Sequence, residues 1–527
     1  QLIHRCRPCT LLVNVSWAMV GAAPLPGNKL QFWHETNGFP ESAPIGRVYT
    51  SDLVRALMRV VRRYVQSLFV TDMGKRLLKY VLGGRPYIVA GAAGARGVIR
   101  RRMSRVRWRT RIVLWGAALA AGLAVVAFAK LADLALEIFH VASENRPWLP
   151  FLLTPVVGMA AVWLTRRYFD GAQGSGIPQV IAAARLSARG NPVGPLVSLR
   201  IAAGKILLGT FALVGGYSVG REGPSVQVAA SIMHAAQRWL PHRRALRAQD
   251  LLIAGGAAGV AAAFNTPLAG IVFAIEELGR RLETRTSGIL LSTIILAGLV
   301  SIALVGNYNY FGTLSVEAVD AGIILPIIVS GVVCGVLGGV FSKLLLWPMR
   351  HPGQSLWQWR ARNPILFAGV CGLLVAVIGF VGGGFSYGSG YVVTAQVVAG
   401  TADTPWHAPV TRFLATLVSY YSGIPGGIFA PSLAVGAGIG SDLAHLLGAS
   451  SNVPLIALCM AGFLAAVTQS PITAAIIVME MVDGHEMVIS LMAISLIAKA
   501  VSARISPELY QQLALAWLRQ DSPRRSG

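Results

Sequence analysis

Long apolar runs dominate the chain from about residue 111 to its C-terminal end. From Trp115 onward, runs of roughly 15 to 25 residues recur between short polar breaks, the length that helices need to cross a hydrocarbon core about 30 Å thick. The first two predicted spans run from about Arg111 to His140 and from Trp148 to about Arg167. This pattern predicts an all-α protein that crosses a membrane several times.

Several of the later runs are too short to cross a bilayer. A half-helix is predicted after Pro178, a span near residues 197–214 and a helix that opens at Glu222. The remaining apolar runs lie at residues 251–264, 268–278, 288–305, 322–347, 364–382, 391–399, 409–420, 428–447, 454–467, 471–482 and 487–501. Because short apolar helices lie at membrane depth only when other protein segments satisfy their ends, we expect tilted and broken helices that pack together.

One extended sequence pattern occurs twice. Residues 261–268 (AAAFNTPL) precede an apolar stretch that ends at Glu276, and residues 465–472 (AAVTQSPI) precede a stretch that ends at Glu480. The prolines and the glutamates align at the same spacing. Duplicated halves with interrupted helices are typical of transporters whose binding site lies where the repeats meet. Chance similarity between alanine-rich segments is the alternative.

Composition agrees with a membrane protein and excludes an ordinary soluble domain. The chain is 54% hydrophobic and 13% charged, with a mean hydropathy of +0.60, whereas soluble domains carry about 25% charged residues. Most of the net charge of +24 falls on residues 1–111, which hold 20 Lys and Arg but only 4 Asp and Glu. Because Lys and Arg favour the cytoplasmic side, we expect the N-terminal side there. Nucleic-acid binding by this arm is disfavoured, since arginines beside a membrane usually set topology and contact anionic lipid.

The composition changes near residue 105 and divides the chain into three predicted regions. Residues 1–104 form a basic N-terminal extension that is either disordered or not native to the functional unit. Residues 105–515 form the transmembrane domain, with halves at about 105–285 and 286–515, and residues 516–527 form a short tail. The chain shows no cleavable signal peptide at its start.

Metal and catalytic motifs are not recognisable in the sequence. The nine histidines lack the spacing of metal ligands, and the lone CxxC at Cys6 and Cys9 has no second pair. Nucleotide-binding and nucleophile motifs do not occur in a context that would support them. We therefore expect no metal, no cofactor and no enzymatic activity.

Three short motifs place glycine and proline where a loop meets an apolar, helix-forming stretch. They are GSGIP at 174–178, GREGP at 220–224 and GIFAP at 427–431, and the last two match further because a serine follows each. Proline is tolerated in the first turn of a helix, and glycine lets the backbone approach a ligand closely. The free N–H groups and partial positive charge of a helix N-terminus bind anions without a full cation. The motifs therefore predict an anion pathway at membrane depth.

Glu222 lies inside the second of these motifs. The donors that would hold an anion there would also hold the Glu222 carboxylate, which makes it a built-in competitor that protonation would release. Acidic residues within spanning segments are costly and usually functional. The alternative is a glutamate that only caps its helix.

Together and in this order, the three motifs resemble those of the CLC family of chloride channels and transporters. The resemblance covers roughly residues 105–515 and extends to FNTPLAG at 264–270 and PELY at 507–510. It implies a homodimer in which each subunit has its own anion pathway, built from two inverted halves of tilted and broken helices. Only 17 residues follow Tyr510, so we expect the bacterial type without the cytosolic CBS domains of other members.

The resemblance also implies roles for individual residues. The predicted chloride-binding residues are Ser175, Gly176, Arg221, Gly223, Ile428, Phe429 and Tyr510. Ser175 and Tyr510 would supply hydroxyls to a central chloride, the amides of Ile428 and Phe429 would complete that site, and the amides near Arg221 would shape an outer one. Relatives that favour nitrate carry proline at the position of Ser175, so serine favours chloride. Fluoride-selective relatives depart from these motifs, which disfavours fluoride.

Glu277 corresponds, by the same resemblance, to the internal proton-transfer glutamate of exchanging members. Its partner in the repeat is Met481, whereas Glu276 pairs with Glu480, as expected if Glu277 has a function that belongs to one half only. The alternative is that both glutamates extend to the cytoplasmic interface beside the arginines at 280–281.

Two basic residues near the predicted anion motifs, Arg221 and Lys205, each have two possible roles. Arg221 would either add positive field to the pathway or orient its loop. Lys205 stands alone in an apolar span, where it would either raise the local potential for anions or form a purely structural pair.

The combined prediction is chloride/proton exchange, with Glu222 as the outer gate and proton acceptor and Glu277 as the inner proton-transfer glutamate. A passive chloride channel gated by voltage or pH is the first alternative, because a channel needs only a slightly wider pathway. A membrane sensor or scaffold with a vestigial pathway is a remote one. We expect chloride, protons and the lipid bilayer as partners, a homodimer, no nucleic acid and a multi-pass location in a bacterial inner membrane.

Overall fold

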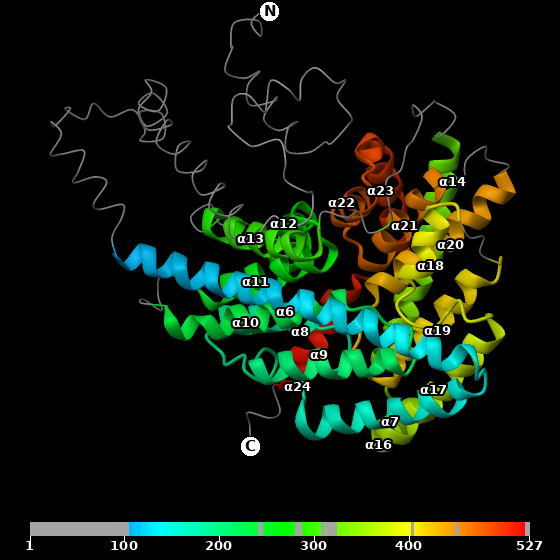
Figure 1. Ribbon diagram of the computed structural model, residues 1–527, viewed down its shortest axis with the longest axis horizontal. Coiled ribbons are helices and arrows are strands. Elements are labelled where there is room, and N and C mark those ends of the chain that lie inside the picture. Colours follow the sequence, from blue (N-terminus) through cyan, green and yellow to red (C-terminus); the bar gives the residue numbers. More distant parts are fainter. Residues whose placement is uncertain are drawn as a thin grey trace, which may run out of the picture. The chain divides into compact units, whose positions relative to one another are not determined.

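The computed structural model describes residues 105–240, 246–279, 287–306, 311, 324–401, 405–447 and 453–521 (Figure 1). The predicted extension at 1–104 and the arginines at 280–281 lie outside these residues. Within the part described, the regular structure is helical apart from two isolated bridges between extended segments. The all-α architecture predicted from the apolar runs is confirmed.

The helices follow the predicted apolar runs closely. The earlier ones are α6 (Arg105–Glu144), α7 (Leu149–Tyr168), α8 (Ile177–Ala188), α9 (Leu199–Val214), α10 (Glu222–Ala236), α11 (Ala248–Phe264), α12 (Pro267–Phe273) and α13 (Ser287–Val305). The later ones are α14 (Ile324–Leu345), α15 (Trp347–Arg350), α16 (Ser355–Arg362), α17 (Pro364–Val381), α18 (Tyr391–Val398), α19 (Ala408–Ser422), α20 (Phe429–Leu447), α21 (Val453–Thr468), α22 (Pro471–Val482), α23 (Val488–Ile505) and α24 (Leu509–Asp521).

The differences from prediction are local. Helix α6 begins and ends beyond the predicted limits of the first span, and α15 and α16 fill a stretch between runs that the apolar pattern did not assign. The run predicted at 268–278 is not one regular helix, because α12 continues into a π-helical turn, η2 (Ala274–Gly279). Such turns are rare and occur often at functional sites.

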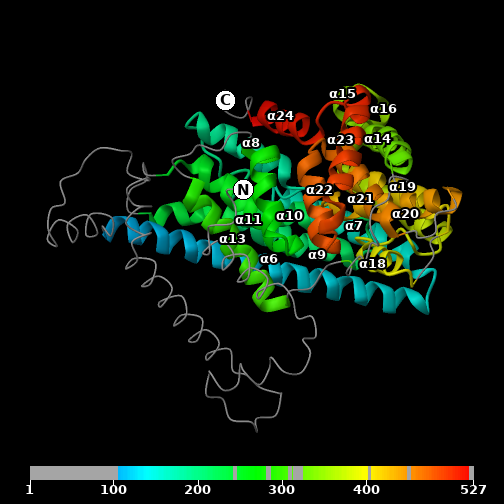
Figure 2. The same cartoon turned by 90° about the horizontal axis from the view of Figure 1, so that it is seen from above.

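Helices in corresponding positions of the chain pack in corresponding ways. Helix α10 packs on α11 as α20 packs on α21, and α6 packs on α13 as α14 packs on α23. Helices α7 and α17 hold equivalent places in the two halves and contact each other, and so do α12 and α22. These paired contacts support a duplicated architecture, to which α24 adds a further helix that lies against α8 (Figure 2).

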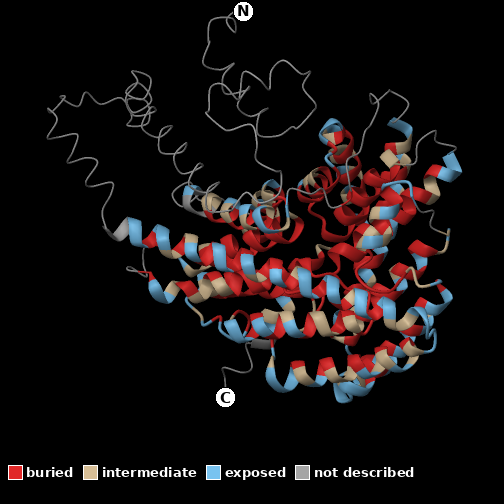
Figure 3. Cartoon of the chain, in the orientation of Figure 1, coloured by how far each residue is buried: buried red, intermediate tan, exposed pale blue. Residues whose placement is uncertain are grey.

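Glycines let the central helices approach each other closely. A Cβ atom at Gly255 of α11 would lie 2.7 Å from the Cα of Ala230, and one at Gly436 of α20 would lie 2.7 Å from the Cα of Met460. Helices α11 and α21 are buried along almost their whole length (Figure 3). Because small residues at contacts allow tight packing between helices in a membrane, these glycines fix the central pair of each half.

Several described helices are long and apolar enough to cross a membrane. They cover Trp108–Glu144, Leu149–Tyr168, Ile324–Leu345, Pro364–Val381 and His485–Ile505. Helices such as α11, α21 and α22 are apolar but shorter. Large apolar side chains on the long helices are exposed, for example Leu123 and Val381, as expected for surfaces that face lipid. The fold therefore combines full spans with short and broken helices.

Candidate anion-binding site

Backbone hydrogen bonds join the loops of the three predicted anion motifs. The amide of Gly174 donates to the carbonyl of Ile424 at 3.1 Å, and the amide of Gly426 donates back to the carbonyl of Gly174 at 3.0 Å. Gly220 and Gly427 exchange two bonds, each of 2.7 Å. Three segments that are far apart in the sequence therefore meet at one place.

Each of these loops leads into the N-terminus of a helix. Helix α8 begins after Gly176, which has a φ of +101°, α10 begins at Glu222, and α20 begins at Phe429. Helix α10 packs against both α8 and α20. Each of the three helices has proline within its first three residues, where the missing N–H costs little. The arrangement gathers three partial positive charges at one buried point.

The glycines of the motifs are required by close contacts between the loops. A Cβ atom at Gly223 would lie 2.3 Å from the Ser175 Oγ, and one at Gly427 would lie 3.1 Å from the Gly223 amide nitrogen. A Cβ atom at Gly176 would lie 2.8 Å from the Cβ of Gln227. A side chain at any of these positions would separate the loops.

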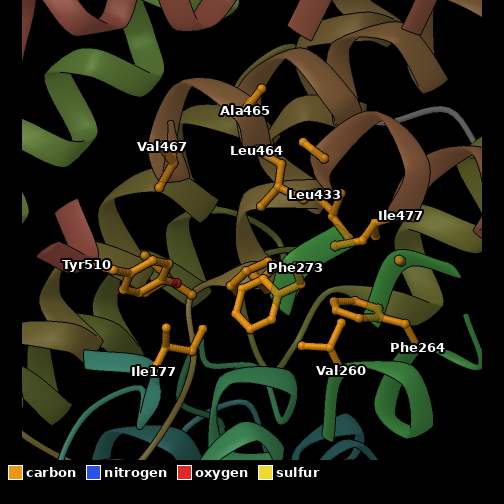
Figure 4. Close-up of a cluster of buried hydrophobic side chains, with 14 of the residues drawn as sticks. Ile177, Val260, Phe264, Phe273, Leu433, Leu464, Ala465, Val467, Ile477 and Tyr510 are labelled. Carbon is orange, nitrogen blue, oxygen red and sulfur yellow. The ribbon is translucent and has the colours of Figure 1, made fainter. Parts of the chain in front are cut away.

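Two buried hydroxyls lie at this junction. Ser175 is 3% exposed and Tyr510 is 1% exposed, and within the described residues neither hydroxyl makes a hydrogen bond. The Ser175 side chain is a near neighbour of the Tyr510 hydroxyl. The Tyr510 ring stacks on Phe429 with a centroid distance of 6.0 Å, among apolar side chains that include Phe273 and Ile177 (Figure 4). Because buried hydroxyls normally find partners, this pair has the donors that a dehydrated anion needs.

Glu222 lies between the N-termini of α10 and α20. Its side chain is 1% exposed, and its Oε1 accepts a hydrogen bond of 2.6 Å from the Tyr391 hydroxyl. A Cβ atom at Gly220 would lie 2.3 Å from the other oxygen, Oε2, and 3.3 Å from the Ala430 amide nitrogen, which places Oε2 beside the first turn of α20. The carboxylate therefore occupies space next to the helix N-terminus that an anion would use.

Arg221 contacts α6. Its Nη1 donates to the Ala129 carbonyl and to the Asp133 carboxylate, each at 2.5 Å. Arg221 is 6% exposed, whereas the Asp133 side chain is 58% exposed. Both line a cavity of about 330 Å³ together with Lys130 and Ser301. This geometry fits a residue that orients its loop, and it also places positive charge at the wall of a cavity.

Lys205 is fully buried and supports the first loop. Its ammonium group donates to the carbonyls of Ala172 and Gly174, both at 2.7 Å, and to that of Gln173 at 3.4 Å. These carbonyls directly precede Ser175. Lys205 therefore fixes the loop and brings a positive charge close to it, which fits both interpretations of this residue.

Glu277 is buried in the π-helical turn after α12. It is 3% exposed, its Oε2 accepts a bond of 2.6 Å from the Ser470 hydroxyl, and its Oε1 accepts a bond of 3.2 Å from the Gln511 amide. The Arg185 guanidinium in turn donates to Gln511. Because Gln511 follows Tyr510 in α24, the second glutamate is linked to the anion junction through consecutive residues. This burial does not fit a side chain extended to an exposed interface.

Glu276 and Glu480 make exchanged helix caps. Glu276 accepts bonds from the Ile472 amide at 3.2 Å and the Thr473 amide at 2.7 Å in the first turn of α22. Glu480, at the end of α22, accepts a bond of 2.9 Å from the Ala269 amide in the first turn of α12. The repeat that aligned these glutamates is thus reflected in a reciprocal contact between the two halves.

The sequence-based predictions missed several residues that contact the site. They are Asp133, Tyr391, Ser470 and Gln511. One of them had a signal, because Tyr391 follows Gly388-Ser389-Gly390, a repetition of the Gly-Ser-Gly in the first anion motif. The others had none, since their contacts join segments that are far apart in the chain.

A multi-pass helical protein in which helix N-termini and buried, unbonded hydroxyls converge has the architecture of an anion transport protein. A sequence model of the voltage-gated chloride channel family, the CLC family, matches residues 157–503, more than half of the chain. The chain belongs to this family. It is therefore a membrane transport protein.

Solved structures of this class share the fold. A slow cyanobacterial Cl⁻/H⁺ antiporter is 23% identical with a TM-score of 0.69, over 79% of this chain and 99% of that one. A eukaryotic CLC transporter is 22% identical with a TM-score of 0.65, over 77% and 74% of the two chains. A CLC-type fluoride/proton antiporter is 22% identical with a TM-score of 0.63, over 76% and 96%. At these identities the likeness shows the fold alone.

Proposed function

We propose that this protein moves chloride across a membrane in exchange for protons. The observation that carries the proposal is the position of the Glu222 carboxylate. It lies between the N-termini of α10 and α20, at the junction that also holds the free hydroxyls of Ser175 and Tyr510. A carboxylate and a chloride ion would contend for the same donors.

Chloride would bind without direct contact with a cationic side chain. The amides of Ile428 and Phe429, where α20 begins, and the hydroxyls of Ser175 and Tyr510 would replace its hydration. Oriented helix dipoles and hydroxyl donors in a buried site are worth more than in water because the surroundings cannot screen them. The ring of Phe429, stacked on Tyr510, keeps one side of this site apolar.

Protons would enter the cycle at Glu222 and Glu277. Protonation would remove the charge of Glu222 and with it the attraction to the helix N-termini, so chloride would take its place. Glu277 would pass protons to and from Glu222, and its link through Gln511 to Tyr510 puts it next to the anion route. Exchange would follow because the outer site accepts either the ionised glutamate or the anion.

The test is proton movement in sealed liposomes that contain the purified protein and are driven by a chloride gradient alone. With the membrane potential clamped, we expect protons to move against their own gradient. Glu222→Ala should retain chloride flux and lose proton movement, and Glu277→Gln should do the same. Uphill proton movement that persists in Glu222→Ala would contradict the mechanism.

The same experiment separates the alternatives. Chloride flux without proton movement in the unmodified protein would make it a passive channel, with Glu222 as a gate. Fluoride flux that greatly exceeds chloride flux would reassign the anion. No anion flux, together with no chloride binding by calorimetry, would leave a sensor or scaffold.

We also propose a homodimer in a bacterial inner membrane with the N-terminal side in the cytoplasm. The arginines at 100–111 motivate the orientation. Labelling of a cysteine introduced near residue 105 from one side of intact cells would test it, and crosslinking in liposomes would test the dimer.

A further inference from the structure

The N-terminus of α18 repeats the local structure of the N-terminus of α8. The tripeptide Gly-Ser-Gly at 388–390 precedes α18, as the same tripeptide at 174–176 precedes α8. The first glycine has a φ of +66° in both loops, and the second has a φ of +101° in the first loop and +88° in the second. Because α8 and α18 also occupy the same place in the order of paired helices, the two loops are repeat counterparts. The first carries Ser175, and the second leads to Tyr391.

Tyr391 contacts the proposed gate directly. Its hydroxyl donates to the Oε1 of Glu222 at 2.6 Å, and the Arg221 guanidinium lies 5.7 Å from the centroid of its ring. The Phe311 ring lies on it as well, with a centroid distance of 5.8 Å. A hydrogen bond to an ionised carboxylate is roughly twice as strong as one between neutral groups. The carboxylate is therefore held from α18 through Oε1, while its other oxygen lies beside the first turn of α20.

Hydrogen bonds from Arg412 hold the loop that precedes Tyr391. The buried Arg412 donates to the carbonyls of Tyr387 at 3.3 Å and Gly388 at 2.7 Å, and also to that of Phe385. A Cβ atom at Gly390 would lie 2.7 Å from the Cβ of Ala434 in α20. The start of α18 is thus fixed against α20, which fixes the backbone from which the Tyr391 side chain extends.

We propose that Tyr391 is a positioning residue that holds the Glu222 carboxylate in the anion site and thereby sets how readily chloride displaces it. This inference rests on the proposed role of Glu222 as a competitor of chloride. A chloride ion that takes the place of the carboxylate must break the bond from Tyr391. The hydroxyl therefore lowers the apparent affinity for chloride and slows exchange.

The test is Tyr391→Phe in the full-length protein, with chloride titrated by calorimetry. The change removes one oxygen and keeps the ring. We expect chloride to bind about tenfold more tightly, the factor that corresponds to about 1.4 kcal/mol. We also expect faster exchange in liposomes with proton coupling retained, since the Glu222 carboxyl remains.

Tyr421→Phe is the matched control. Tyr421 is also half-buried, and its hydroxyl donates at 2.5 Å to the Leu344 carbonyl, away from the anion junction. Tyr421→Phe also removes the hydrogen bond of a half-buried tyrosine hydroxyl, so an effect of lost stability alone on chloride binding would appear in both variants. Chloride affinity should change only in Tyr391→Phe.

The double variant with Glu222→Ala separates positioning from general structure. Without the carboxylate there is nothing for Tyr391 to hold, so Tyr391→Phe should leave chloride affinity unchanged in that background. An effect that persists there, or an unchanged affinity in the single variant, would overturn the inference. If Glu222→Ala alone fails to tighten chloride binding, the proposed competition itself is wrong, which is a distinct result.

Discussion

At the scale of single residues, the informative feature is a pair of buried donors that the protein leaves unused. A buried polar group without a partner typically costs about 1–3 kcal/mol, so folding alone gives no reason to keep two of them together. Within the described residues, the hydroxyls of Ser175 and Tyr510 are in this state, and the loops around them are held by backbone bonds and by Lys205. A bound anion would recover the cost.

Removing these hydroxyls should weaken chloride binding. Ser175→Ala and Tyr510→Phe each delete one donor to a charged ligand, an interaction worth about 1.5–3 kcal/mol, so each should lower affinity about tenfold or more. Calorimetry with purified protein measures this. Because neither hydroxyl bonds to a described residue, thermal stability without chloride should not fall, and a large loss of stability in Tyr510→Phe would indicate a structural role instead.

At the scale of elements, the two halves hold each other through exchanged helix caps. Glu276 accepts from the first turn of α22, and Glu480 accepts from the first turn of α12. A carboxylate at a helix N-terminus satisfies free N–H groups and opposes the helix dipole. The two caps are not equivalent in their surroundings, because only α22 begins beside Ser470, which binds Glu277.

The exchanged caps predict an asymmetric effect. Glu276→Ala and Glu480→Ala should each destabilise the protein by about 1 kcal/mol, the usual cost of losing a helix cap. Thermal unfolding in detergent measures this, with the exposed Glu486→Ala as the control. Proton coupling should weaken in Glu276→Ala and not in Glu480→Ala, because a shift of the α22 N-terminus moves Ser470 away from Glu277. Equal loss of coupling in both would show that the caps act only through stability.

At the scale of the whole molecule, most of the candidate site lies within residues 157–503, which the family model matches, whereas Asp133, Tyr510 and Gln511 lie outside that range. Among the described residues, the contacts of the candidate site given above run from Ala129 to Gln511. Because α6 packs on α13 as α14 packs on α23, the helix contacts favour a boundary between the halves after α13. The boundary near residue 285, which precedes α13, stays a prediction from the sequence. We expect the basic stretch before α6, which lies outside the described residues, to serve topology rather than transport.

Deletion of residues 1–98 should therefore leave transport intact. This variant keeps the arginines at 100–111, so we expect chloride-driven proton movement in liposomes at a rate close to that of the full chain. Replacing those arginines with glutamine in the same variant should impair correct insertion without changing the coupling of the protein that does insert. Loss of coupling in the first variant would assign the extension a part in transport.

Apolar run lengths and the positions of glycine and proline were enough to predict the helical class, most helix positions, the repeat and the three loops that meet at the candidate anion site. These follow from local physics: apolar length sets spans, and glycine with proline sets the start of a helix. The folded chain was needed to reveal that Tyr391 holds Glu222, that Gln511 and Ser470 hold Glu277, and that Glu276 and Glu480 cap each other's helices. Such contacts join residues 169 to 234 positions apart, and their geometry depends on how the two halves pack, which no local pattern encodes.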